Sequence, residues 1–209
     1  SELQDIESMV GRSLFTADLR ATLTQFENAK NFGSLIVPKL KDPQECLRVV
    51  EAQDLGNDMF RAKLRERLLT VLRMAEALSS KYHVVVANPP YMGGKGLNGQ
   101  LGDFLKNEYK DVKSDVFSAF MVRNTYLAVE GGQLGFMTPF VWMFLSSYEK
   151  LRIFMLEHKT ITSLIQLEYS GFDGATVPIC TFTIENKHRP DLRGGYVRLS
   201  DFRGAKNQA

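Results

Sequence analysis

An apolar run that stops at two prolines constrains this sequence more than any other feature. Residues 82–87, Tyr-His-Val-Val-Val-Ala, have the composition of a strand, and the three consecutive valines predict a parallel strand buried on both faces. Asn88, Pro89, Pro90 and Tyr91 follow directly, and neither proline can donate a hydrogen bond to a β-ladder. The strand therefore ends here. Because open α/β sheets bind their ligands at the carboxyl ends of strands, the sequence predicts a site at these four residues.

The four residues after the strand suit a planar group that carries an amine. The amide oxygen of Asn88 and the carbonyl oxygen of Pro89 can accept the two hydrogens of an exocyclic NH2 group. The ring of Tyr91 can stack on the heterocycle that bears this group. The pattern indicates methylation of the amino group of a nucleobase. An alternative stays open, because Asn-Pro opens many turns and a Pro-Pro-Tyr run in a loop can be a ligand for a small recognition domain.

Several segments of the chain resemble one enzyme family. Residues 84–91 resemble the catalytic motif of the amino-methyltransferases that use S-adenosylmethionine, in its adenine-N6 DNA form. Residues 114–120 resemble the helix that follows the catalytic loop in that family, and residues 131–139 resemble its next strand. Residues 140–151 and the stretch around residues 5–10 are similar to the large methyltransferases of the BREX and phage-growth-limitation defence systems (PglX-like, type IIG-like). The resemblance covers most of the chain, and Asn-Pro-Pro-Tyr is its most specific part.

The resemblance implies a site-specific DNA methyltransferase that uses S-adenosylmethionine and flips its target adenine out of double-stranded DNA. Asn88 and the Pro89 carbonyl would hold the N6 amino group, and Tyr91 would stack on the flipped ring. Phe172 falls where the family places a second aromatic side chain against the base, although an ordinary core aromatic residue is the alternative. Lys95, in the glycine-rich segment after the motif, is a candidate contact to a DNA phosphate.

The glycine-rich turn through which this fold binds its cofactor is not found ahead of Asn88. The nearest candidate, residues 31–37, has one glycine and places it before the apolar run. The family carries the glycine motif first and the catalytic motif later, and the sequence begins at Ser1 without an initiator Met. We therefore expect an internal fragment of a larger protein, with unknown cofactor-binding residues and no activity of its own. The expected fold is α/β, a partial class I (Rossmann-like) methyltransferase sheet preceded by a helical region.

Three segments are predicted along the chain. Residues 1–80 form a helical region, because apolar residues recur there at a spacing of about 3.6 and β-branched runs are few. Residues 81–186 form the catalytic-loop half of the methyltransferase domain, since strands and helices alternate from there on. Residues 187–209 are polar and basic and form a linker toward a target-recognition region outside the chain.

Within the helical region, helices are predicted over residues 42–53 and 58–80. The second of these carries a cluster of basic residues, which are candidates for phosphate contacts on DNA. We favour a solvated helix face on which they pair with Glu66 and Glu76. The basic residues are Arg61, Lys63, Arg65, Arg67 and Arg73.

The composition is that of an ordinary globular domain, with 44% hydrophobic and 24% charged residues. No apolar stretch is long enough to span a membrane, so no membrane contact is expected. Two cysteines, Cys46 and Cys180, are too few for a disulfide framework, which favours a reduced, cytoplasmic location. The net charge of +2 argues neither for nor against nucleic acid.

Other chemistries find little support. The three histidines lack Cys or carboxylate partners at ligand spacing, so no metal site is expected. No Gly-x-Ser-x-Gly turn indicates a hydrolase. The acidic pairs Asp103 with Glu108 and Asp111 with Asp115 are interpreted as surface-helix carboxylates.

Three functions stay open. The leading one is the catalytic-loop half of an adenine-N6 DNA methyltransferase in a restriction-modification or phage-defence system, with double-stranded DNA and other defence-system proteins as partners. The second keeps the chemistry but acts on a protein glutamine amide or an RNA base, since any planar NH2 group beside a carbonyl or ring nitrogen suits the same acceptors. The third is a non-catalytic module that binds DNA or protein. The sheet edge left by absent strands would also favour self-association.

Overall fold

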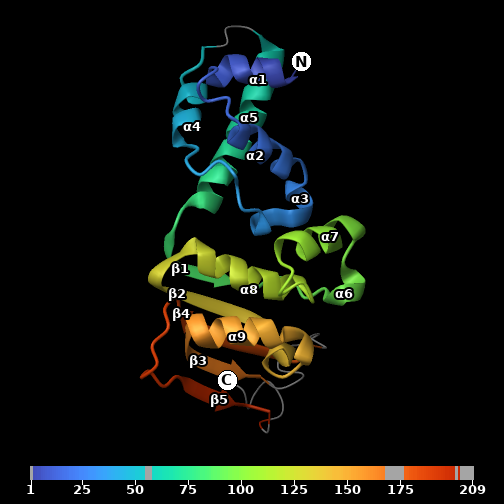
Figure 1. Cartoon of the computed structure of the whole chain (residues 1–209), viewed down its shortest axis with the longest axis vertical. Coiled ribbons are helices and arrows are strands. Elements are labelled where there is room, and N and C mark those ends of the chain that lie inside the picture. Colours follow the sequence, from blue (N-terminus) through green and yellow to red (C-terminus); the bar gives the residue numbers. More distant parts are fainter. Residues whose placement is uncertain (1, 55–57, 168–176, 201, 203–209) are drawn as a thin grey trace. The chain divides into compact units, whose positions relative to one another are not determined.

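The chain divides into two compact units, residues 1–80 and 81–209, and each is described by itself. The first is helical and the second contains a mixed five-stranded sheet with helices, so the predicted α/β fold with a helical region ahead of the sheet is confirmed (Figure 1). The computed structural model describes residues 2–54, 58–167, 177–200 and 202.

The first unit is built around one long helix, α5 (Met59–Ser79), against which the shorter helices pack. Asp58 caps it, because its side chain accepts hydrogen bonds from the backbone N–H groups of Phe60 and Arg61. Leu68 and Leu72 lie in the core of the unit. The predicted helices at 42–53 and 58–80 are confirmed as α4 and α5. The remaining elements are α1 (Glu2–Val10), α2 (Ala17–Glu27), α3 (Ala29–Phe32), the 3-10 helix η1 (Gly33–Leu35) and α4 (Gln44–Glu51).

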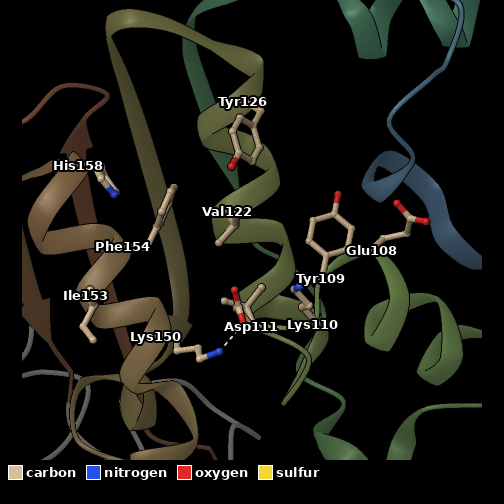
Figure 2. Close-up of a pocket in the computed structure, with 11 residues that line it drawn as sticks. Glu108, Tyr109, Lys110, Asp111, Val122, Tyr126, Lys150, Ile153, Phe154 and His158 are labelled. Carbon is tan, nitrogen blue, oxygen red and sulfur yellow. Dashed lines mark hydrogen bonds and ion pairs between the residues drawn. The ribbon is translucent and has the colours of Figure 1, made fainter.

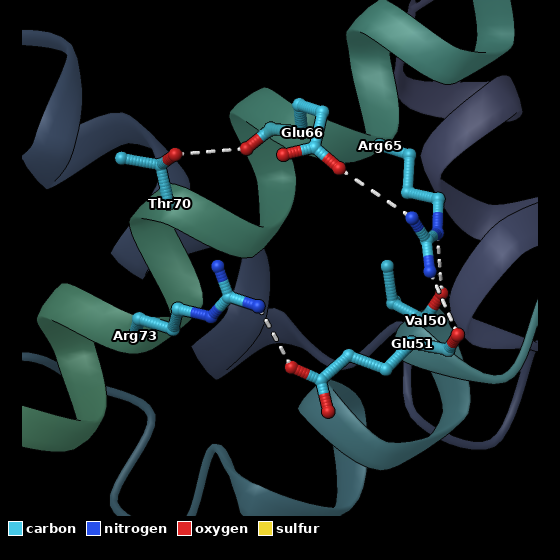
Figure 3. A network of polar contacts seen from close by, with 6 residues as sticks. All are labelled: Val50, Glu51, Arg65, Glu66, Thr70 and Arg73. Atoms are coloured by element: carbon cyan, nitrogen blue, oxygen red, sulfur yellow. Dashed lines mark hydrogen bonds and ion pairs between the residues drawn. The ribbon is translucent and has the colours of Figure 1, made fainter.

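Two of the basic residues of α5, Arg65 and Arg73, make polar contacts within the helical unit (Figure 3). The Arg65 guanidinium donates to the carbonyl oxygens of Val50 and Glu51, at 2.9 and 2.7 Å, and so satisfies the carboxyl end of α4. It also lies 3.4 Å from Glu66, the pairing that the sequence predicts. Arg73 pairs with the Glu51 carboxylate at 3.0 Å. The predicted pairing with Glu66 is confirmed, but among the described residues no ion pair joins Glu76 to this face, and Arg73 pairs with Glu51 instead.

The sheet of the second unit has the strand order β1-β2-β4-β3-β5. β1 is parallel to β2, β4 is antiparallel to both β2 and β3, and β5 is parallel to β3. α8 packs on β1 and β2, and α9 packs on β3 (Figure 1). The strands are β1 (Tyr82–Ala87), β2 (Ala128–Pro139), β3 (Thr160–Gln166), β4 (Ile179–Glu185) and β5 (Gly195–Arg198). The helices are α6 (Gly93–Gly96), α7 (Gly99–Glu108), α8 (Val116–Leu127), η2 (Phe140–Met143), η3 (Ser146–Tyr148) and α9 (Glu149–His158).

The core of this unit lies on the sheet face that α8 and α9 cover. Phe182 of β4 is at its centre, with its ring centroid 5.3 Å from that of Phe136 and 5.2 Å from that of Trp142. All three residues are buried, together with Leu134 and Ile184 on the same two strands. This packing joins β2 and β4 to the 3-10 segment η2.

β1 lies at the edge of the sheet. Its pairing with β2 is parallel, as predicted, but Val84 and Val86 are 62% and 77% exposed. The prediction of a strand buried on both faces is therefore wrong for this unit. The physical reason is twofold: within the described residues β1 pairs with β2 alone, and Val86 lies against Gly135, which has no side chain to cover it. Val85 and Ala87 alternate to the other face and are half-buried.

The segment predicted as a linker, residues 187–209, contributes a strand. β5 pairs in parallel with β3, with Leu164 opposite Tyr196 and Ile165 opposite Val197. All four residues of β5 are exposed, so this strand forms the opposite edge of the sheet from β1.

Replacing Arg65 with Ala tests the structural role of the basic face. The variant removes the Arg65 bonds to the carbonyl groups of Val50 and Glu51, of which Val50 also accepts the backbone N–H group of Gln53. We therefore expect the free energy of unfolding of the helical unit to fall by about 1–2 kcal/mol. Arg48→Ala is the matched control, because Arg48 belongs to the exposed Glu45 pair and such pairs contribute at most about 1 kcal/mol. Urea unfolding followed by circular dichroism measures both. Equal stability of the two variants would contradict the capping role.

Candidate active site

The Asn-Pro-Pro-Tyr segment occupies the turn that leaves the carboxyl end of β1, as the sequence predicts. The last pair of the β1–β2 ladder is Ala87 opposite Phe136, and the prolines begin two residues later. Asn88 is exposed, Pro89 is buried and Tyr91 is half-buried. The turn is thus anchored by one buried proline while the amide of Asn88 faces outward.

The hydroxyl group of Tyr91 ties this turn together. Its oxygen lies 2.7 Å from Oδ1 of Asn88 and 3.0 Å from the carbonyl oxygen of Met137 on β2. Both neighbours are acceptors, so the phenol is the donor and shares its single proton between them. Burial raises the pKa of Tyr91, with a smaller effect from Cys180, and the group therefore stays protonated at neutral pH. The sequence motif indicates a role for the ring of Tyr91 but gives no signal for this role of its hydroxyl group.

Thr138 and Cys180 lie near Tyr91, on the neighbouring strands β2 and β4. Thr138 of β2 stands opposite Cys180 of β4, and Trp142 donates its indole N–H to the Thr138 hydroxyl at 3.2 Å. Burial is the main cause that raises the pKa of the Cys180 thiol, so this residue is held as the thiol rather than the thiolate. The arrangement gives no support to covalent catalysis by Cys180.

Asp115 is a second component of the site. The sequence predicts a surface carboxylate here, and this prediction is wrong, because Asp115 is only 6% exposed. Its carboxylate accepts the backbone N–H groups of Met92 at 3.2 Å and Gly93 at 2.8 Å, directly after the motif. It also caps α8 through the N–H group of Val116 at 2.6 Å. An acidic residue immediately before an apolar helix is a capping signal, which could have identified part of this role.

The structure does not describe the side chains of two predicted substrate contacts, Phe172 and Lys95. Phe172 belongs to residues 168–176, which are not among the described residues. Lys95 lies in α6, where the side chains of residues 94 and 95 are not described either. Among the described residues, no cluster of three or more His, Cys, Asp or Glu side chains could hold a metal ion. No helix in the described part of the chain has the length and apolar character needed to cross a membrane.

A separate pocket of about 450 Å³ lies between α8, α9 and the segment that follows α7 (Figure 2). Its wall combines aromatic side chains, among them Tyr109, Tyr126 and Phe154, with charged and aliphatic ones. An ion pair of 2.6 Å joins Asp111 and Lys150 at its rim. The pocket is lined by residues of segments 108–126 and 150–158, so the Asn-Pro-Pro-Tyr turn takes no part in it.

Comparison with known proteins now identifies the family. Residues 10–172 match the family model described as Eco57I restriction-modification methylase, and this range includes the Asn-Pro-Pro-Tyr turn. The chain belongs to the Eco57I restriction-modification methylase family. The predicted relationship to adenine-specific methylases of restriction and BREX systems is thereby confirmed.

Two curated relatives of this Eco57I-family chain are adenine-specific methyltransferases. The adenine-specific methyltransferase BrxX of Escherichia coli O9:H4 (strain HS) is 35% identical over 189 residues, which cover 88% of this chain and 16% of that protein. The adenine-specific methyltransferase PglX of Lacticaseibacillus casei (strain Zhang) is 30% identical over 220 residues, 99% of this chain and 18% of that protein. A solved methyltransferase subunit of a type I restriction-modification system from Streptococcus thermophilus is 18% identical, with a TM-score of 0.46, over 66% of this chain and 36% of that one. The chain thus spans less than a fifth of the length of the two curated relatives.

The pKa of Tyr109 leads to a prediction about alkaline stability. Burial raises this pKa to about 12, and Arg123 opposes the shift. An unfolded tyrosine has a pKa of about 10, so the contribution of Tyr109 to stability is complete below pH ~10 and is lost as the pH rises toward 12. We expect the urea midpoint of the sheet unit to fall over this range, and to fall less steeply in Tyr109→Phe. Identical slopes in the two proteins would contradict this assignment.

Proposed function

We propose that the protein containing this chain methylates the N6 amino group of adenine in double-stranded DNA, with S-adenosylmethionine as the methyl donor. The observation that carries this proposal is the Asn-Pro-Pro-Tyr turn at the carboxyl end of β1, with the amide of Asn88 exposed and oriented by Tyr91. Support comes from the relatives, which are adenine-specific methyltransferases and, in a further case, the type II restriction enzyme and methyltransferase RM.Eco57I of Escherichia coli, 24% identical over 157 residues. Its setting is a restriction-modification or phage-defence system.

Two acceptors do the chemical work in this proposal. Oδ1 of Asn88 and the carbonyl oxygen of Pro89 accept the two hydrogens of the target amine, which localises the nitrogen lone pair for attack on a methyl group. An amide oxygen has two lone pairs, so Asn88 can keep its bond from the Tyr91 hydroxyl while it accepts one hydrogen of the substrate. The hydroxyl thus orients the acceptor, and the ring of Tyr91 stacks on the flipped base. Phe172 and Lys95 are proposed as further contacts, to the base and to a phosphate.

The glycine segment nearest to the expected cofactor motif lies in the helical unit. The nearest glycine candidate ahead of Asn88, at residues 31–37, forms the end of α3 and the 3-10 helix η1 and does not follow a strand. Gly33 has a φ of 53°, but no strand precedes it among the described residues of the helical unit. The chain therefore supplies the amine acceptors, and its cofactor-binding residues are unassigned.

The proposal includes partners and a location. Residues 81–186 act as the catalytic-loop half of the methyltransferase domain, and residues 187–209 lead toward a target-recognition region. Double-stranded DNA is the substrate, and other defence-system proteins are partners. The exposed valines of β1 favour self-association of the isolated chain, because an edge strand with unpaired N–H and C=O groups can pair with a second copy. A DNA substrate and two buried, unpaired cysteines favour the cytoplasm.

Three variants of the full-length protein test the roles of the motif. Asn88→Ala removes one acceptor, so we expect kcat for methyl transfer to duplex DNA to fall by about a hundredfold or more. Tyr91→Phe keeps the ring and loses only the hydroxyl group, so a fall of about tenfold is expected. Tyr91→Ala loses both and should resemble Asn88→Ala. Incorporation of labelled methyl groups into DNA gives the rates.

Tyr126→Phe is the control, since Tyr126 is 56% exposed on α8 and lies outside the turn. Equal activity of Asn88→Ala and the unmodified protein would overturn the assignment. Transfer to an RNA or to a glutamine-containing peptide but not to duplex DNA would favour the second function. A full-length protein that binds DNA and transfers no methyl group to any of these substrates would favour the interaction module.

A further inference from the structure

Asp115 is a buried carboxylate that no lysine or arginine pairs with among the described residues. It is 6% exposed, and its two oxygens accept three backbone N–H groups, from Met92, Gly93 and Val116. A carboxylate held away from water is costly unless hydrogen bonds satisfy it, and backbone donors fulfil that need here. The hydrogen bonds of this carboxylate therefore go to backbone N–H groups.

Capping of α8 accounts for only one of these three bonds. The cap uses Oδ1 and the N–H group of Val116, the first residue of the helix. Among the described residues, Oδ2 accepts from Gly93 alone, and Oδ1 also accepts from Met92. Both donors lie more than twenty positions earlier in the chain. A serine or asparagine would cap the helix equally well, so capping does not explain why a carboxylate stands here.

α8 is a rigid support for this carboxylate. Its residues Phe117, Ala119 and Met121 are fully buried. At its carboxyl end, the side-chain amide of Asn186 donates to the carbonyl oxygens of Thr125 and Ala128, at 3.0 and 3.1 Å. Asn186 follows β4 directly, so the helix is tied to the middle of the sheet. A group fixed to α8 therefore holds a constant position relative to β2.

The turn that carries the motif is held at three places in sequence. The β1–β2 ladder fixes it before Asn88, and the Tyr91 hydroxyl fixes it to the carbonyl group of Met137. Asp115 fixes it after Tyr91, through the next two N–H groups. Gly93 has a φ of 60°, a conformation that favours glycine, and its N–H group points at the carboxylate.

We propose that Asp115 is a positioning residue, whose carboxylate holds the backbone at residues 92 and 93 and so fixes Asn88 and Tyr91 for transfer to the amine. This inference rests on the proposed methyl transfer. Positioning governs such a reaction because displacement by about 1 Å can lower the rate a hundredfold. The carboxylate of Asp115 bonds to the turn and to the start of α8, so the proposed effect on the reaction passes through the turn.

Hydrogen exchange of the full-length protein tests the clamp without reference to activity. Asp115→Asn keeps an oxygen for the helix cap but presents an NH2 group to one of the loop donors. Asp115→Ser keeps the cap and is too short to reach residues 92 and 93. In both variants we expect the amides of peptide 88–96 to exchange faster by about tenfold or more, because hydrogen bonds to a charged acceptor are lost. Asp58→Asn is the matched control, since Asp58 caps α5 in the helical unit by the same chemistry.

Kinetics of the same variants test the positioning role. We expect kcat to fall by about ten- to a hundredfold in both Asp115 variants, with KM for duplex DNA within about threefold of the unmodified protein. Asp58→Asn should leave both constants unchanged. Unchanged exchange in peptide 88–96 would overturn the clamp, and faster exchange with unchanged kcat would overturn the positioning role. If the unmodified protein methylates no adenine while exchange still rises in both Asp115 variants, the clamp stands and the proposed function is overturned.

Discussion

The parallel pairing of β1 with β2 is the constraint on which the site depends. It aligns Ala87 with Phe136, and so brings the turn after β1 beside the carbonyl group of Met137. The two prolines then prevent the ladder from continuing, which forces the chain out of the sheet at one defined position. The Tyr91 hydroxyl bonds to the carbonyl oxygen of Met137 and to Oδ1 of Asn88, and so orients the Asn88 amide. Without the ladder, none of these contacts would have a fixed geometry.

The features that depend on local sequence could be predicted. A valine run followed by two prolines specifies a strand and its end, and the apolar spacing specified α4 and α5 with their beginnings. The amine acceptors follow from the same four residues, because Asn88 and Pro89 carry their oxygens wherever the turn lies.

The features that depend on tertiary register could not be predicted. The sequence of β1 is that of a strand covered on both faces, yet Val86 lies at the sheet edge beside a glycine, and nothing local to β1 reveals this. The role of Asp115 could not be predicted either, since two of its hydrogen-bond donors lie more than twenty positions away in the sequence. The basic helix shows the opposite case. Its pairing was predictable in kind, but the partner of Arg73 is Glu51 on α4, a contact that only packing of the two helices creates.

The identity of the methylated base tests the central claim most directly. Full-length protein would be incubated with duplex DNA and S-adenosylmethionine, and the DNA would then be digested to nucleosides for mass spectrometry. The account predicts N6-methyldeoxyadenosine as the methylated nucleoside, since Asn88 and Pro89 accept an exocyclic amine next to a ring on which Tyr91 stacks, and the relatives are adenine-specific methyltransferases. Methylation at a ring carbon, or at the amino group of cytosine alone, would contradict it.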